Sequence, residues 1–253
     1  MSFQTIINNE LVIAGVSLKD DAYQEKNNMG LHVSNNEAAV IDNRKQLAEA
    51  IGVTLNDFVC ANQTHSDRFY QVMEEDKGRG AWSIDDAIED VDALYTKEAD
   101  LVLTSFTADC VPLVFYDEST NIIGAIHSGW KGSIQSITEK LFTHLMKEHS
   151  LNSDSCHVYI GTCLSQRNFE VDEDVMLLFK QLQYADQWIR YDASRKKYFI
   201  DNQQVVKAQC MRSGIKEEHI HIDSTCTMDS ETGFSYREDK QAGRHMTFIM
   251  RKS

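Results

Sequence analysis

Short apolar runs separated by polar or glycine-containing stretches recur along the chain, and runs of this length predict β-strands. The run at residues 122–126, Ile-Ile-Gly-Ala-Ile, is continuously apolar, which indicates a strand buried on both faces. We expect strands over residues 10–16, 58–62, 101–105, 111–116, 122–126, 156–160, 197–200, 219–222 and 245–250.

Helical periodicity is clear in a few longer segments. Residues 133–149 repeat apolar side chains at Ile134, Ile137, Leu141 and Leu145, which lie on one face of a helix. The segment at 172–182 opens with acidic residues, as a helix N-terminus favours. We also expect helices over residues 42–51 and 202–213, the latter ending at Gly214.

The order of these elements indicates the fold class. Strands and helices are interleaved irregularly, and several neighbouring strands are too close in sequence for a helical crossover. This pattern predicts an α+β (mixed α/β) domain with mixed sheets. Pro112 is the only proline and no glycine- or serine-rich stretch interrupts the chain, so we expect residues 1–253 to form a single domain.

Composition narrows the function classes. The 253 residues include 25 Lys and Arg against 39 Asp and Glu, a net charge of -14, which argues against nucleic acid or an anionic membrane as partner. The apolar runs are too short to span a bilayer, and the N-terminal residues lack a secretion signal. Six cysteines without a CxxC pair are typical of free thiols, so we expect a cytoplasmic protein.

Three segments end in a residue type that binds zinc. His65, Cys110 and His127 each lie near the end of an apolar, strand-like run. Two imidazoles and a thiolate suit zinc, and three protein ligands leave the fourth tetrahedral position open, as in catalytic sites. An isolated His or Cys is more often an ordinary structural residue, and no local spacing rule joins these three. The same residues also fit a Cys–His hydrolase with Cys110 as its nucleophile.

Several cations are candidates for binding an anionic substrate. Residues 128–133 form a glycine-containing turn that leads into a helix and carries Lys131. Arg237 follows an aromatic run, and Arg44 stands near a predicted helix start, where a positive charge is unfavourable and suggests a specific role. The turn at 128–133 is also a common structural connection between a strand and a helix. For the run before Arg237 the alternative is a solvated loop with ordinary core aromatics, which composition alone favours, and the same comparison applies to Arg44. We interpret the acidic stretch at residues 85–92 as a solvated surface loop.

Short segments spread over almost the whole chain resemble, in order, one protein family. It is the laccase-domain (polyphenol oxidase-like) family, associated with purine nucleoside phosphorolysis and adenosine deamination. The matching segments are residues 43–44 (NR), 62–65 (NQTH), 92–94 (DAL), 108–112 (ADCVP), 126–132 (IHSGWKG), 160–163 (IGTC), 169–171 (FEV) and 234–237 (FSYR). Lys131 stands where the family commonly has Arg, and Thr162 where Pro is common.

The resemblance implies a fold, a site and an activity. The implied fold is a layered α/β/β/α domain shared with bacterial toxin cysteine hydrolases. The implied metal ligands, which are also the catalytic residues, are His65, Cys110 and His127, with Zn²⁺ as the metal and copper as its alternative. The implied substrates are purine nucleosides and phosphate, with Arg44, Lys131 and Arg237 as candidate phosphate-binding residues.

The implied enzyme is a purine nucleoside phosphorylase that also deaminates adenosine and accepts 5′-methylthioadenosine. Asp109 is a weak candidate for the proton shuttle of deamination, since its neighbour Cys110 would lie on the opposite face of a strand. We expect a monomer or a weak homodimer. The alternatives are a Cys–His hydrolase or amidase, a copper-dependent polyphenol oxidase, and a non-catalytic metal- or partner-binding module.

Overall fold

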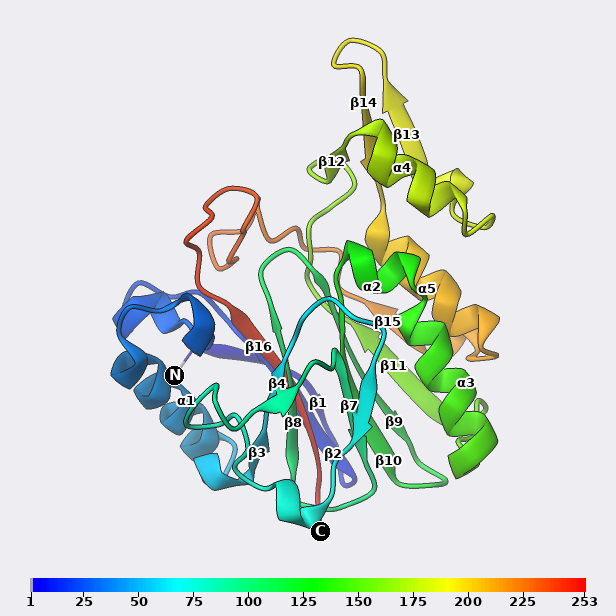
Figure 1. Cartoon of the computed structure of the whole chain (residues 1–253). Coiled ribbons are helices and arrows are strands. Elements are labelled where there is room, and N and C mark those ends of the chain that lie inside the picture. Colours follow the sequence, from blue (N-terminus) through cyan, green and yellow to red (C-terminus); the bar gives the residue numbers. More distant parts are fainter. Residues whose placement is uncertain (1) are drawn as a thin grey trace.

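A computed structural model of the chain describes residues 2–253. Two large mixed sheets form the centre of the molecule (Figure 1). The first has the strand order β1 (Phe3–Asn8), β2 (Val12–Ser17), β16 (His245–Arg251), β8 (Val102–Thr107) and β3 (Phe58–Val59). The second has the order β15 (Ile220–Ile222), β11 (Cys156–Ile160), β9 (Val111–Asp117), β10 (Ile122–Ser128), β7 (Ala93–Thr96) and β5 (Phe69–Gln71).

Helices cover the outer faces of both sheets. In Figure 1, α1 (Glu37–Ala50) lies on one side of the sheet pair, and α3 (Ile137–His149) and α5 (Asn202–Arg212) lie on the other. The short helix α2 (Trp130–Ile134) precedes α3. Isolated 3-10 turns occupy Gln24–Asn27, Leu31–Val33, Leu55–Asp57, Glu74–Asp76, Asp186–Trp188 and Glu217–His219.

Three apolar layers hold this arrangement together. The middle layer, between the sheets, includes Leu103 and Ile249 from the first and Val114 and Ile123 from the second. The outer layers pack α1 against the first sheet, and α3 with α5 against the second. The predicted layered α/β/β/α fold with mixed sheets is therefore confirmed, while its likeness to toxin cysteine hydrolases stays a prediction.

A smaller unit projects from one end of the sheets. It consists of α4 (Glu173–Lys180) and a sheet of β12 (Glu170–Val171), β14 (Lys197–Ile200) and β13 (Ile189–Asp192) (Figure 1). Its apolar cluster also includes Trp130, Ile134 and Val205, which belong to α2 and α5 of the main body. A further two-stranded parallel pair consists of β4 (Ala61–Asn62) and β6 (Ile88–Glu89). Within residues 2–253 no helix has the length and apolar character that crossing a membrane requires.

Two helix predictions were wrong in their bounds. The first helix begins at Glu37 rather than residue 42, because the Asn36 side chain accepts a hydrogen bond from the amide of Ala39 and caps it there. The helix predicted over 133–149 is split into α2 and α3 at Ser136, which has a left-handed φ of 60°. The predicted helices at 172–182 and 202–213 correspond closely to α4 and α5.

Candidate metal centre

The pairing of β9 with β10 brings Cys110 beside His127. In this antiparallel pair His127 lies opposite Pro112, and Ser128 lies opposite Val111. Cys110 directly precedes Val111, so it stands at the beginning of β9 next to the end of β10. Both strands are buried on both faces, so polarity does not fix this register. Packing does, because Gly124 lies opposite Phe115 and a Cβ there would lie 2.3 Å from the Phe115 ring.

The loop that carries His65 is fixed by hydrogen bonds at two points. The Gln63 side chain donates to the carbonyl of Phe106 and accepts from the amide of the same residue. The carboxylate of Asp92 accepts from the amides of Thr64, His65 and Ser66. His65 itself adopts a left-handed φ of 62°, an uncommon conformation that these bonds hold in place.

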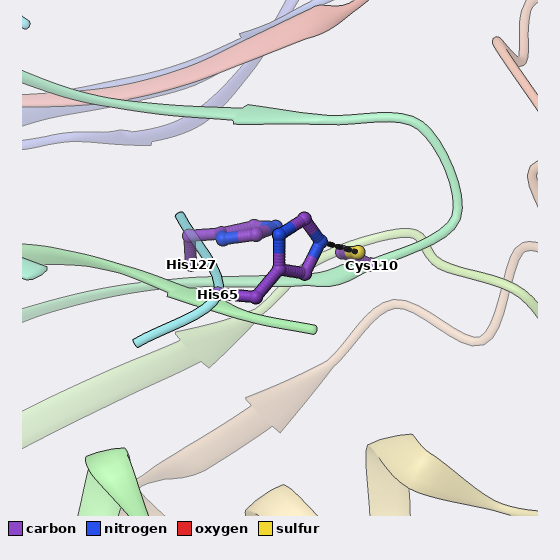
Figure 2. Close-up of side chains that lie close together, drawn as sticks. All are labelled: His65, Cys110 and His127. Atoms are coloured by element: carbon purple, nitrogen blue, oxygen red, sulfur yellow. Dashed lines mark hydrogen bonds between the residues drawn. The ribbon is translucent and has the colours of Figure 1, made fainter. Parts of the chain in front are cut away.

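The three predicted ligands converge at one point (Figure 2). Their ligand atoms all lie within 4.8 Å of one another, and Cys110 Sγ is 3.7 Å from His65 Nε2. The His65 and His127 rings meet edge to face, with centroids 4.8 Å apart. Metal–nitrogen bonds of about 2.0 Å and metal–sulfur bonds of about 2.3 Å place tetrahedral ligands ~3.3–3.7 Å apart. The donor set therefore fits a zinc-type ion, and the pair at 3.7 Å already has the spacing of bound ligands.

Gly129 lets His65 and Cys110 lie close to the backbone of the turn after β10. A Cβ at this position would lie 2.6 Å from Cδ2 of His65 and 3.0 Å from Sγ of Cys110. Its backbone is extended at φ -64° and ψ 167°, a conformation open to any residue. The glycine is thus required for the close approach of the two ligands and not for an unusual backbone angle.

Asp92 is a site residue that the sequence interpretation missed. Its Oδ1 lies 2.7 Å from Nδ1 of His127, and its side chain is fully buried. This bond orients the ring so that Nε2 is the atom available to a metal, an arrangement common behind ligating histidines. The interpretation of residues 85–92 as a solvated loop was therefore wrong at Asp92. The sequence signal that could have identified Asp92 is the segment at 92–94, which resembles the family.

The electrostatics of the centre favour a thiolate. Burial acts to raise the pKa of Cys110, but the charge and hydrogen bonding of His127, with a further contribution from His65, lower it to about 6. Burial acts to lower the pKa of His127, but Cys110 and the Asp92 carboxylate raise it to about 9. In the metal-free protein the pair is therefore a thiolate beside an imidazolium, and metal binding would displace the imidazolium proton.

Two cavities meet at the centre. We call one the Arg244 cavity, of about 420 Å³, and the other the Trp130 cavity, of about 540 Å³. All three candidate ligands line the Arg244 cavity, whereas His65 and Cys110 also line the Trp130 cavity. Tyr236 lies on the border of both. The centre therefore faces two separate compartments of small-molecule size.

The three candidate phosphate-binding cations lie in different places. Arg44 is buried, and its guanidinium donates to the carbonyls of Met29, Gly80 and Ala81. It lies behind Phe106, whose ring is 4.9 Å from the guanidinium carbon, and lines neither cavity. Lys131 is exposed and also outside both cavities.

Of the three candidate phosphate-binding cations, Arg237 lines the Trp130 cavity. Its Nη1 donates to the carbonyl of Glu170. Asp109 lies in the turn between β8 and β9 with a left-handed φ of 85°. Its two carboxylate oxygens accept from the Thr227 hydroxyl and the Arg237 amide, each at 2.6 Å. Asp109 therefore anchors the loop that carries Tyr236 and Arg237. These two hydrogen bonds occupy the carboxylate oxygens that a proton shuttle would need.

Comparison with known proteins places this geometry in a family. Residues 13–252 match the family model described as multi-copper polyphenol oxidoreductase laccase. The chain belongs to this laccase-like family. A curated relative from Bacillus subtilis, named purine nucleoside phosphorylase YlmD, is 32% identical over 97% of this chain and 91% of its own.

Solved structures of relatives have the same fold. A hypothetical protein YfiH from Bacillus licheniformis superimposes with a TM-score of 0.90 at 31% identity, covering 95% of this chain and 93% of its own. YlmD from Geobacillus stearothermophilus gives a TM-score of 0.90 at 28% identity, covering 96% and 92%. The resemblance seen in the sequence segments is therefore confirmed.

The multi-copper description of this family contrasts with the donors in this chain. Within residues 2–253, one group of three or more His, Cys, Asp or Glu side chains has ligand atoms that converge. It consists of His65, Cys110 and His127. A multi-copper centre needs further histidines around a second and third ion. The donor set of this laccase-like protein fits one metal ion.

Proposed function

We propose that this protein is a zinc-dependent purine nucleoside phosphorylase, which converts adenosine or inosine and phosphate to the free base and ribose 1-phosphate. In this reaction a phosphate oxygen bonds to C1′ of the ribose while the bond from C1′ to the base nitrogen breaks, and the proton of the phosphate ends on the base. The observation that carries the proposal is the three-donor centre at the junction of two cavities. The relatives named purine nucleoside phosphorylase support it.

The metal would be held by His65, Cys110 and His127. Two imidazoles and a thiolate suit zinc, with copper as the alternative, and three protein donors leave a position for substrate or water. When bound, such an ion supplies Lewis-acid polarisation of an oxygen atom. The protein's own contribution is to fix the three donors on rigid elements, with Asp92 orienting His127.

We assign the nucleoside to the Trp130 cavity. Trp130, Phe169 and Tyr236 give it aromatic surfaces on which a purine can stack. Asn202 is buried, and its Nδ2 donates to the carbonyl of Ser128, which fixes the orientation of the amide. Its Oδ1 has no hydrogen-bond partner within residues 2–253. A donor on the substrate, such as a base N–H, would satisfy this acceptor.

The proposal includes two further activities. Deamination of adenosine is supported by the open three-donor centre of His and Cys, since zinc deaminases of nucleobases use a comparable donor set. Phosphorolysis of 5′-methylthioadenosine follows from the family resemblance and needs space beyond the 5′ carbon of the ribose. Arg237 lies in the same cavity and is available for contacts with the nucleoside.

A Cys–His hydrolase is the second candidate, because the lowered pKa of Cys110 also suits a nucleophile.

A nucleoside screen with and without phosphate separates these functions by their products. The phosphorylase predicts ribose 1-phosphate only when phosphate is present, and the deaminase predicts inosine from adenosine in either case. A copper oxidase would instead oxidise a phenol. Cys110→Ala is the inactive variant, and Cys163→Ala, which removes a buried cysteine outside the ligand set, is the matched control. Absence of ribose 1-phosphate with every nucleoside tested would refute the phosphorylase.

A further inference from the structure

The two cavities at the centre differ in charge. Within residues 2–253 the lining of the Trp130 cavity includes four carboxylates, Asp109, Glu170, Asp172 and Asp174, against the cations Arg237 and Lys240. The lining of the Arg244 cavity, over the same part of the chain, includes no Asp or Glu. In a protein of net charge -14, this compartment is the one at the centre in which an anion meets no carboxylate.

Arg244 presents an unused donor face. Its Nη1 donates to the carbonyls of Ala242 and Gly243, and its guanidinium carbon lies 5.8 Å from the centre of the Tyr236 ring. Nε and Nη2 have no hydrogen-bond partner within residues 2–253. The side-chain stem packs against Gly30, where a Cβ would lie 2.8 Å from Cγ of Arg244. Gly30 therefore lets Arg244 reach the cavity wall, and the guanidinium retains the paired N–H geometry that phosphate prefers.

Other donors on the same wall are also unpaired. Asn62 and His32 are both exposed, and Cε1 of His32 lies 3.3 Å from the position that a Cβ of Gly30 would take; neither side chain has a hydrogen-bond partner among the described residues. Thr107 is buried, and its hydroxyl is likewise unpartnered in the described part of the chain. Unpaired donors around one cavity are satisfied when a ligand rich in acceptors enters it.

The charges around His32 at this wall are positive. Partial removal from water and the charges of Arg244 and Arg44 lower the pKa of His32 to about 4. His32 is thus a neutral donor at neutral pH. Arg44, although it does not line the cavity, lies directly behind Phe106 in its wall and adds its charge from there.

We propose that the Arg244 cavity is an oxyanion site that binds inorganic phosphate through the guanidinium of Arg244, with Asn62, His32 and Thr107 as supporting donors. Its role in supplying the second substrate rests on the proposed phosphorylase function. Phosphate here and a nucleoside in the Trp130 cavity would meet at the border formed by His65, Cys110 and Tyr236. This assignment replaces Arg44, Lys131 and Arg237 as direct phosphate contacts.

Calorimetric titration of inorganic phosphate into the metal-replete protein tests the site without requiring catalysis. Arg244→Met keeps the stem that packs on Gly30 and removes the charged donors, so we expect phosphate affinity to fall roughly tenfold to a hundredfold. Asn62→Ala, at an exposed position with little risk to folding, should cost roughly threefold to tenfold. Arg237→Met in the Trp130 cavity and Lys131→Met outside both cavities are the matched controls and should leave phosphate affinity within about twofold. Metal content is measured for each variant.

The outcomes separate this site from the enzyme's function. Loss of phosphate affinity in Arg244→Met and Asn62→Ala, with both controls unchanged, supports the site even if no nucleoside is phosphorolysed. Phosphorolysis by the wild type, with phosphate affinity unchanged in both test variants, overturns the site and leaves the function standing. Failure of the metal-replete wild type to bind phosphate overturns the site, as does loss of affinity in Arg237→Met alone.

Discussion

The carboxylate Oδ1 of Asp92 lies 2.7 Å from Nδ1 of His127, and the second oxygen of the same carboxylate accepts from the amides of Thr64 and Ser66. One buried side chain thus joins the loop of the first histidine to the strand of the second. Burial acts to raise the pKa of Asp92, but the hydrogen bond and charge of His127, together with the hydrogen bonds from Ser66, lower it, so Asp92 remains a carboxylate. Asp92 organises two of the three candidate ligands.

Asp92→Asn should therefore weaken metal binding. An amide cannot accept all of these bonds and carries no charge to support His127, and loss of such a partner typically costs tenfold to a hundredfold (about 1.4–2.7 kcal/mol) in metal affinity. Competition with a chromophoric chelator measures the affinity. Asp90→Asn is the matched control, because Asp90 lies in the same loop but pairs with Arg68 and Thr64 rather than with His127. Equal effects of the two substitutions would contradict this role for Asp92.

Gly129→Ala tests the spacing of the ligands. The added Cβ would meet His65 and Cys110 at contact distances that real side chains do not tolerate. Overpacking of this kind costs about 1–3 kcal/mol, so we expect metal affinity to fall roughly fivefold to a hundredfold. Gly132→Ala is the control from the same turn, since its Cβ would find its nearest neighbour at 3.4 Å. Metal affinity that survives Gly129→Ala would show that the ligands do not need this approach.

The pH dependence of Cys110 alkylation distinguishes a ligand from a nucleophile. In the metal-free protein the lowered pKa of about 6 leaves the thiol protonated below pH 6 and reactive above it. The rate of reaction with iodoacetamide should reach half its plateau near pH 6, and His127→Ala should move this midpoint upward. Zinc should suppress the reaction, since coordination occupies the sulfur. An undiminished rate in the zinc-loaded protein would favour the Cys–His hydrolase.

Arg44→Met tests a structural role for this arginine. The substitution removes hydrogen bonds to three buried carbonyls and should cost roughly 2–4 kcal/mol of the free energy of unfolding, measured by urea denaturation. Lys45→Met, at the exposed neighbouring position, should cost much less. A stability equal to that of the wild type would show that these bonds contribute little.

The sequence was informative where local pattern decides the structure. Apolar runs that indicate strands made His65, Cys110 and His127 candidates, because ligands near strand ends lie on a rigid frame, and the family resemblance grouped the three as ligands of one metal. The helices α4 and α5 were found from their periodicity and terminal signals. Asp92 was missed because a carboxylate in an acidic stretch normally faces water, and only the pairing of β7 with β10 brings this one beside His127.

The arginines Arg44 and Arg244 show the same limit of prediction from sequence. Arg44 was assigned to a helix start because the capping role of Asn36 was not recognised. Arg244 was not singled out, since its place in the cavity depends on contact with Gly30, which is more than two hundred positions earlier in the sequence. Charge alone does not reveal which cations share a cavity with the metal ligands, because long-range packing decides it.

Metal titration of the chelated enzyme tests the central claim most directly. Zinc is added stepwise to metal-free wild type in the presence of inosine and phosphate, and ribose 1-phosphate is quantified by phosphorus NMR. The account predicts that the rate rises linearly and reaches its plateau at about one zinc per chain, with base and ribose 1-phosphate formed in equal amounts and Cys110→Ala inactive at every point. Full activity in the chelated wild type, or in Cys110→Ala, would contradict it.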